Sequence, residues 1–254
     1  MKLNYKEFGE GEPLVIMHCL MGMLDNWQAP AKLMQDKLKI IIVDLRNHGH
    51  SPRSDEHNYE VLSEDVIELM DDLNIERAHI LGHSMGGKTA MVLAQNHPDR
   101  VNKLVIADIG PKYYPPHHQS ILAALDAVPL SELERRTDAE EYMKPFISVP
   151  SIRQFLMKSL YHPTRETFDW RFNLHSIKAN IENVGQATDE LDYEGETLFL
   201  RGGNSDYILD EDWPDIKMIF PNSYLITIDG AGHWLHAEQP QPFVDAVLDF
   251  LLEE

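Results

Sequence analysis

The chain has 254 residues, is 43% hydrophobic and carries a formal net charge of −20 at pH 7. This length and composition fit one large globular domain, or a domain that carries an insertion. The negative charge argues against a nucleic-acid binder and against a protein drawn to anionic membranes, because its long-range field repels both. We therefore expect neither nucleic acid nor a membrane as a partner.

The single cysteine, Cys19, excludes an internal disulfide and any zinc site built from several cysteines. It is expected to pack as a small hydrophobic residue. The apolar run at 14–24 follows three glutamates rather than basic residues, and it is too short to span a bilayer. These features predict a cytoplasmic protein.

Short apolar runs alternate with amphipathic stretches along most of the chain. In segments such as 59–75, apolar residues recur at helical spacing. The apolar runs suit strands that are buried on both faces. This alternation predicts an α/β fold with a mostly parallel central sheet flanked by helices. The predicted strands lie at 14–18, 39–44, 78–82, 103–108, 197–203 and 223–230.

The alternation fails once, between Asp108 and Thr197. This stretch opens with a proline-rich segment and contains no convincing strand. We interpret it as a helical cap inserted over the carboxyl edge of the sheet. The predicted domains are a core of residues 1–110 and 191–254 and a helical cap, or lid, of residues 111–190. Within the cap, helix-like segments lie at 121–125, 130–136, 152–161 and 172–184.

The segment Leu81–Ala90, LGHSMGGKTA, fits two motifs. Residues 82–86 match G-x-S-x-G, the sharp turn that lifts a nucleophilic serine above a sheet. Residues 82–89, GHSMGGKT, match G-x-x-x-x-G-K-T, the phosphate-binding P-loop. Both motifs follow a strand and open a helix, but a P-loop usually follows the first strand of its domain, whereas this segment follows the third predicted strand.

Segments far from Ser84 in the sequence favour the interpretation of Ser84 as a nucleophile over the P-loop interpretation. Ser84 needs a base, and His233 stands on a glycine-flanked loop after the last predicted strand. An oxyanion hole needs two backbone N–H groups, which Met85 and Leu20 are placed to supply. In this interpretation Lys88 becomes an ordinary residue in the first turns of a helix.

Six segments give the chain a wider resemblance: HCLMGMLDNW, VDLRNHGHSP, GHSMGGKTAM, ADIGP, FLRGGNS and GAGHWLHAEQP. It resembles the α/β-hydrolases with a helical cap, and within them the small bacterial esterase group related to ABHD11-type proteins. The resemblance covers the whole chain in order. It implies an α/β-hydrolase fold and hydrolysis of carboxylic esters or thioesters, with acyl-CoA among the candidates. One departure is Cys19, where the family usually has glycine, so the shape of the oxyanion loop is open.

Two aspartates are candidates for the acid that orients His233. Asp206 follows the penultimate predicted strand, where most α/β-hydrolases carry this acid. Asp108 ends the strand after the nucleophile, where the resembled esterase group carries it. The resemblance favours Asp108, and Asp206 stays open as the alternative acid.

The predicted chemistry needs no cofactor and no metal. His48 and His50 lie close in sequence, but no Cys, Asp or Glu completes a ligand pattern, so we expect a role in orienting a loop. Four residues that flank the predicted site could contact substrate or could simply pack against their neighbours. They are Met21, Tyr113, Tyr114 and Trp234.

The sequence thus predicts a serine hydrolase that cleaves small-molecule esters or thioesters through a Ser-His-Asp triad and an acyl-enzyme. Two alternatives stay open. One is a P-loop NTPase that uses GHSMGGKT, and the other is a hydrolase fold retained as a non-catalytic ligand-binding module. The oligomeric state is not predicted.

Overall fold

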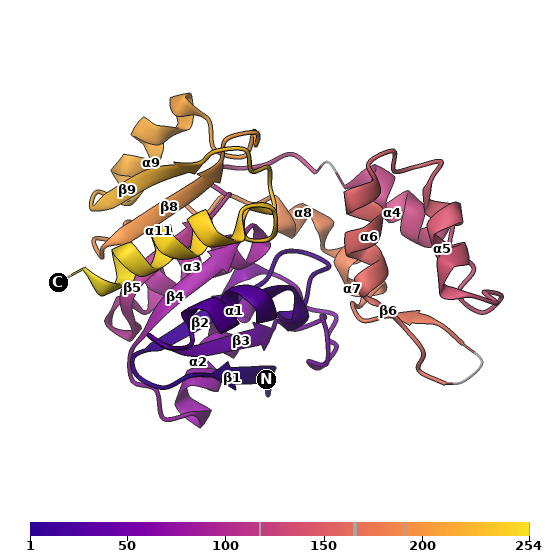
Figure 1. The fold of residues 1–254 in the computed structure, drawn as a ribbon, viewed down its shortest axis with the longest axis horizontal. Helices are drawn as coiled ribbons and strands as arrows, with labels where there is room; N and C mark the ends of the chain where they lie inside the picture. Colours follow the sequence, from indigo (N-terminus) through magenta and orange to yellow (C-terminus); the bar gives the residue numbers. More distant parts are fainter. Residues whose placement is uncertain (117, 165–166, 190, 254) are drawn as a thin grey trace.

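The fold was obtained as a computed structural model that describes residues 1–116, 118–164, 167–189 and 191–253. A seven-stranded sheet with the strand order β1-β3-β2-β4-β5-β8-β9 forms its centre (Figure 1). Strand β1 pairs antiparallel with β3, and all other neighbours in this sheet are parallel. The strands are β1 (Asn4–Phe8), β2 (Pro13–Met17), β3 (Lys39–Asp44), β4 (Ala78–His83), β5 (Val101–Ala107), β8 (Thr197–Gly202) and β9 (Ser223–Ile228).

The six predicted apolar runs coincide with strands β2, β3, β4, β5, β8 and β9, which confirms the mostly parallel sheet. Strand β1 was not expected from the sequence. Its residues, NYKEF, are half-buried or exposed because it pairs with β3 at the edge of the sheet. An edge strand needs no continuous apolar run, so hydrophobic periodicity does not reveal it.

Helices cover both faces of the sheet because alternate strand residues point to opposite sides. One set of strand side chains packs with α2 (Tyr59–Asp72), α3 (Met85–Asn96) and α9 (Trp213–Ile219). The other set packs with α1 (Gln28–Met34) and α11 (Pro240–Leu252), which the short helix α10 (Leu235–Glu238) precedes. No helix within the described ranges is long and apolar enough to cross a membrane.

The described residues between β5 and β8 include five short helices, and we call this segment the helical insertion (Figure 1). These are α4 (Gln119–Asp126), α5 (Arg136–Met143), α6 (Pro150–Lys158), α7 (Leu174–Ala179) and α8 (Ile181–Val184). The expectation that this stretch lacks strands was wrong, because β6 (Leu160–Tyr161) and β7 (Asp169–Trp170) form a small antiparallel pair. Two residues per strand are too few to show an alternating pattern.

The predicted helix at 130–136 was also wrong. Residues 130–135 form turns and bends, and the helix α5 begins at Arg136. Its start is set by the Asp138 carboxylate, which accepts from the backbone N–H of Arg135 at 3.2 Å. A side chain three residues into a helix that accepts from the N-cap N–H is a helix-start signal.

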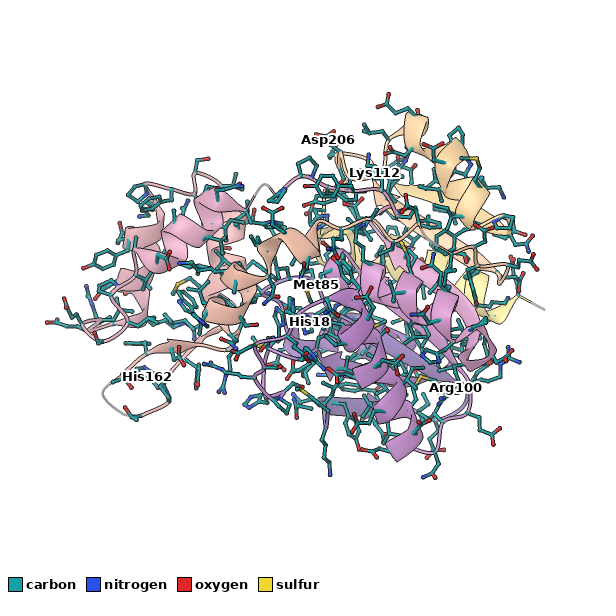
Figure 2. The ribbon with its side chains drawn as sticks, turned by 180° about the vertical axis from the view of Figure 1, so that it is seen from behind. His18, Met85, Arg100, Lys112, His162 and Asp206 are labelled. Carbon is teal, nitrogen blue, oxygen red and sulfur yellow. The ribbon has the colours of Figure 1, made fainter. Side chains whose placement is uncertain are left out.

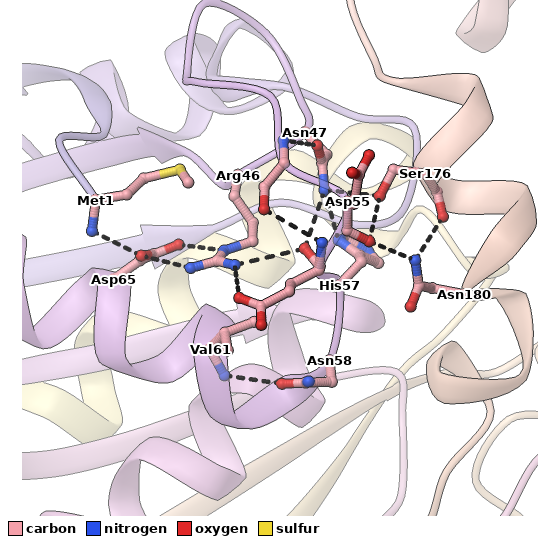
Figure 3. Close-up of polar contacts among 12 residues, drawn as sticks. Met1, Arg46, Asn47, Asp55, His57, Asn58, Val61, Asp65, Ser176 and Asn180 are labelled. Atoms are coloured by element: carbon pink, nitrogen blue, oxygen red, sulfur yellow. Dashed lines mark hydrogen bonds and ion pairs between the residues drawn. The ribbon is translucent and has the colours of Figure 1, made fainter.

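Polar contacts attach the insertion to the loop that follows β3 (Figure 3). Asn47 Nδ2 donates to Ser176 Oγ at 3.2 Å, and Asn180 Nδ2 donates to the Asp55 carbonyl at 2.8 Å. The same loop is tied to helix α2, where Arg46 Nε lies 2.6 Å from Asp65 Oδ2. The insertion therefore rests on a loop that is itself fixed to the core.

Candidate active site

Ser84 occupies a sharp turn between β4 and α3, with φ 54° and ψ −117°. Such a conformation is strained for a residue with a side chain. The turn also needs glycine on both sides. A Cβ on Gly82 would lie 2.0 Å from the Gly86 carbonyl oxygen, and one on Gly86 would lie 2.5 Å from that of Met17. The G-x-S-x-G pattern thus follows from a turn pressed against its own backbone and against β2.

Asp108 lies at the carboxyl end of β5 and is fully buried. Its Oδ2 is 2.7 Å from His233 Nδ1 and accepts from Ser205 Oγ at 2.5 Å. Its Oδ1 accepts from the Gly202 N–H at 3.0 Å. Because a carboxylate only accepts, the Nδ1 atom of His233 carries the proton and Nε2 is left as the basic atom.

Asp206, the alternative acid, is exposed at the periphery of the molecule (Figure 2). The loop that carries Asp206 instead contributes Ser205, whose hydroxyl bonds to Asp108, and Tyr207. The structure thus brings Asp108 to His233 and leaves Asp206 at the surface.

Two further residues hold His233. The Tyr207 ring stacks on its imidazole, with the ring centroids 4.0 Å apart and 18° between the planes. His83 Nε2 lies 2.7 Å from the His233 carbonyl, so this nitrogen must be the donor. Sequence reasoning assigned no role to Ser205 or Tyr207, although Ser205 ends the segment FLRGGNS.

The loop after β2 is shaped by two buried histidines. The Nε2 atoms of His18 and His48 accept from the backbone N–H groups of Leu45 and Met21, each at 3.0 Å. Their Nδ1 atoms face the carbonyls of Cys19 and Arg46 at 2.7 and 2.9 Å. Both rings are therefore neutral, with the proton on Nδ1.

Burial is the main reason that the pKa of His18 is lowered to about 4 and the pKa of His48 to about 3. The two neutral rings can therefore keep accepting from the N–H groups of Leu45 and Met21 across the physiological range. The contact from His48 to Met21 agrees with the expected role of His48 in orienting a loop.

Cys19 does not take the left-handed conformation that the usual glycine would permit. The positive φ in this loop, 59°, falls on Met21 instead. Cys19 is buried, and burial raises the pKa of its thiol to about 12. A thiol that stays protonated is a poor nucleophile, and the side chain packs as a small hydrophobic residue.

Leu20 and Met85, the predicted oxyanion residues, line one small pocket together with Ser84. Met85 is the first residue of α3 (Figure 2), so its N–H has no acceptor within the helix. In the neighbouring loop, Met21 N–H is already bonded to His48. Leu20 lines both this pocket and the larger cavity together with Ser84.

A larger cavity of about 340 Å³ contains both Ser84 and His233 on its walls. Of the predicted substrate contacts, Met21 and Trp234 line this cavity, and Tyr114 lines the small pocket, whose volume is about 30 Å³. Sequence reasoning missed the cavity wall that the insertion supplies, since lone apolar residues on short helices and loops carry no signal. The apolar residues of this wall are Ile121, Ile147, Ile152, Phe155 and Leu156.

Tyr113 is 52% exposed and is absent from the described residues that line either space, so the structure does not support its expected substrate contact. Its neighbour Tyr114 turns inward, where its hydroxyl accepts from the Gly110 N–H at 2.9 Å and donates to the Tyr207 carbonyl at 2.5 Å.

Lys88 is not the ordinary helical residue that the sequence suggested. It is 1% exposed, and its ammonium donates to the carbonyls of Pro111, Lys112 and Gln186 at 3.3, 2.8 and 2.6 Å. Pro111 and Lys112 precede the helices of the insertion, and Gln186 follows them. Since helix α3 begins directly after Ser84 and Lys88 is bound elsewhere, the P-loop interpretation is not favoured.

The described residues contain no group of three or more His, Cys, Asp or Glu side chains that could hold a metal ion. Ser84 and His233 are among the polar residues in the wall of the large cavity, and the first backbone N–H groups of helix α3 lie beside Ser84. Such a set can attack a carbonyl carbon, move one proton and stabilise one oxyanion.

A mostly parallel sheet with a serine at a strand-to-helix turn and a histidine after the last strand defines the class of α/β hydrolases. The α/β-hydrolase fold family matches residues 12–240 of this chain. The chain belongs to this family.

Several proteins of this family are similar to the chain over most of its length. The sn-1-specific diacylglycerol lipase ABHD11 of Mus musculus is 37% identical over 94% of this chain and 80% of its own length. Esterase YbfF of Escherichia coli (strain K12) is 35% identical over 99% of both chains. The solved structure of a marine microorganism esterase is similar with a TM-score of 0.95 and 41% identity, covering 98% of this chain and 99% of that one.

Proposed function

We propose that this protein is a serine hydrolase of carboxylic esters, with Ser84 as nucleophile, His233 as general base and Asp108 as the acid that orients it. The observation that carries the proposal is the 2.7 Å contact between His233 Nδ1 and Asp108 in a wall of the cavity that also contains Ser84. The esterase and lipase relatives support the same class of reaction.

In the first half of the reaction, Ser84 Oγ attacks the ester carbonyl carbon while His233 Nε2 takes the hydroxyl proton. The N–H groups of Leu20 and Met85 donate to the oxyanion that forms, and each such donor contributes about 10²- to 10³-fold in rate. The carbonyl then re-forms, the bond to the leaving oxygen breaks, and His233 gives its proton to that oxygen. The acyl group stays on Ser84.

In the second half, water attacks the acyl carbon while His233 takes one of its protons. The bond to Ser84 Oγ then breaks, His233 returns the proton to this oxygen, and a carboxylic acid leaves. Asp108 stabilises the imidazolium in both halves. A thioester can follow the same steps with a thiol as the leaving group, so we include thioesters such as acyl-CoA among the proposed substrates.

We also propose that residues 111–190 act as a lid over a core of residues 1–110 and 191–254. Seven described residues of this segment line the large cavity, and five of them are apolar, namely Ile121, Ile147, Ile152, Phe155 and Leu156. Such a lid would exclude water from the acyl-enzyme and select the substrate by shape.

The test is labelling with a fluorophosphonate probe followed by mapping of the modified residue. We expect the label on Ser84 and its loss in Ser84→Ala. The matched control is Ser120→Ala, which changes a second serine that lines the large cavity and should keep the label. Labelling that persists in Ser84→Ala contradicts the proposed nucleophile, and so does an unlabelled wild-type protein. Rates with p-nitrophenyl esters and acyl-CoA thioesters then compare the two substrate classes.

A further inference from the structure

Two apolar spaces of very different size meet at Ser84. The large cavity has a volume of about 340 Å³, and the small pocket has about 30 Å³. Leu20, Ser84 and Tyr207 lie in the walls of both. An ester bound at Ser84 has two arms, the acyl arm and the alcohol arm, and the two spaces cannot accept them interchangeably.

The position of His233 assigns the alcohol arm to the large cavity. In the proposed mechanism His233 gives its proton to the leaving oxygen, so this oxygen must lie within hydrogen-bond reach of the imidazole. His233 lines the large cavity and is not among the described residues that line the small pocket. The chain attached to the leaving oxygen therefore extends into the large cavity.

The remaining direction at the carbonyl carbon belongs to the acyl arm. The oxyanion points to the N–H groups of Leu20 and Met85, and the leaving oxygen points to His233. Met85 lines the small pocket together with Ile109, Ile181 and Val184. The acyl carbon chain thus enters a space bounded by these apolar side chains.

The small pocket accepts only a short chain. Its volume of about 30 Å³ is less than a tenth of the 340 Å³ of the large cavity, so the shorter arm of the ester is the one that it accepts. Its walls are also fixed. The buried Tyr59 donates its hydroxyl proton to the Val184 carbonyl at 2.6 Å, and the Gly110 N–H donates to the Tyr114 hydroxyl at 2.9 Å.

The large cavity, in contrast, suits an apolar chain. The helical insertion contributes Ile121 from α4 and Ile152 and Phe155 from α6, and Ile147 lies between α5 and α6. A volume of 340 Å³ falls at the lower end of the range for small-molecule sites, about 300–1,000 Å³. The cavity is thus roughly ten times larger than the pocket for the acyl arm.

We propose that the preferred substrates are esters with a short acyl group, acetyl or propionyl, and a longer apolar alcohol. Hydrolysis then forms a short carboxylic acid in the small pocket and an apolar alcohol in the large cavity. This inference rests on the proposed function, because it uses the role of His233 as the acid for the leaving group.

Two isomeric esters test the inference directly. Octyl acetate and ethyl octanoate have the same composition and differ only in which side of the ester carries the long chain. We expect kcat/KM for octyl acetate to be at least about 10²-fold higher, since each methylene that a pocket rejects costs about 10- to 200-fold. Equal rates, or a preference for ethyl octanoate, overturn the inference.

Labelling separates this failure from a failure of the proposed function. If the fluorophosphonate probe modifies Ser84 but octyl acetate is not hydrolysed, the assignment of the two arms is wrong and the nucleophile stands. If Ser84 is not modified, the proposed function fails and this inference fails with it.

A pair of variants tests the assignment of the small pocket. Ile181→Ala enlarges that pocket and should raise the ratio of kcat/KM for ethyl butanoate to that for ethyl acetate by about tenfold. The matched control is Ile147→Ala, which removes the same number of atoms from the large cavity and should leave this ratio unchanged. An increase of the ratio in the control alone contradicts the assignment.

Discussion

The carboxyl edge of the sheet and the helical insertion differ in how their residues are held. At the sheet edge, Asp108 is fully buried and accepts from Gly202 N–H, Ser205 and His233. The insertion instead faces the large cavity with apolar side chains. Among its links to the core are the bonds of Lys88 and of Asn47. This difference indicates that the carboxyl edge of the sheet holds the proposed catalytic residues, whereas the helical insertion largely determines the proposed choice of substrate.

The largest expected effect comes from the acid at the sheet edge. Asp108→Asn removes the carboxylate that fixes the His233 tautomer, so kcat should fall by about 10⁴-fold. Asp206→Asn is the matched control, because Asp206 is exposed and should change kcat little. Steady-state kinetics on p-nitrophenyl acetate measures both. Comparable losses of kcat in the two variants would contradict the assignment of Asp108 as the acid that orients His233.

A smaller loss of rate is expected from the loop that carries Leu20. His48→Phe leaves the Met21 N–H without its buried acceptor, so the loop should shift, and misplacement by about 1 Å can cost roughly 10²-fold in rate. We expect kcat to fall by this factor with less change in KM. Circular dichroism checks that the variant is folded.

His50→Phe is the control for the loop variant, because His50 lies two residues away and is exposed. It should keep the wild-type kcat, since it keeps the backbone N–H that donates to Asp44 at 2.8 Å and loses a 3.4 Å contact between its Nδ1 and Arg171. A similar fall of kcat in both variants would mean that the loop responds to any bulky change rather than to the loss of the His48 acceptor.

The smallest effect on kcat is expected where the insertion is attached. Lys88→Met keeps the apolar stem but leaves three carbonyls without their donor, so thermal stability should fall and KM should rise more than kcat falls. Lys112→Met, which removes a half-exposed ion pair with Asp212, should change both quantities less. Equal effects would contradict a special role for Lys88.

The loss of stability in Lys88→Met relative to wild type should depend on pH. Burial lowers the pKa of Lys88 from 10.5 to about 7 in the folded protein. Between these values the unfolded chain binds more protons, so this residue makes the free energy of unfolding increase with pH across that window. The difference in stability between wild type and Lys88→Met should therefore grow from pH 7 to pH 10. A constant difference would show that the Lys88 ammonium stays charged when buried.

Local patterns in the sequence identified much of the core and of the candidate site. The apolar runs located six strands because a strand buried on both faces needs a continuous apolar stretch. G-x-S-x-G located the turn at Ser84 because the close approach of Gly82 to Gly86 excludes any side chain. Strand β1 and the pair β6 and β7 escaped detection, since edge strands and two-residue strands need no such pattern.

The sequence by itself therefore determined the class of fold and the residues at the turn, because these depend on neighbours a few positions apart. Only the tertiary structure decided which aspartate meets His233, since 125 positions separate Asp108 from it in the chain. The same holds for Lys88, whose motif suggested a phosphate but whose ammonium bonds to three carbonyls of other segments. The sizes of the two spaces at Ser84 also depend on packing between distant segments, which no local pattern records.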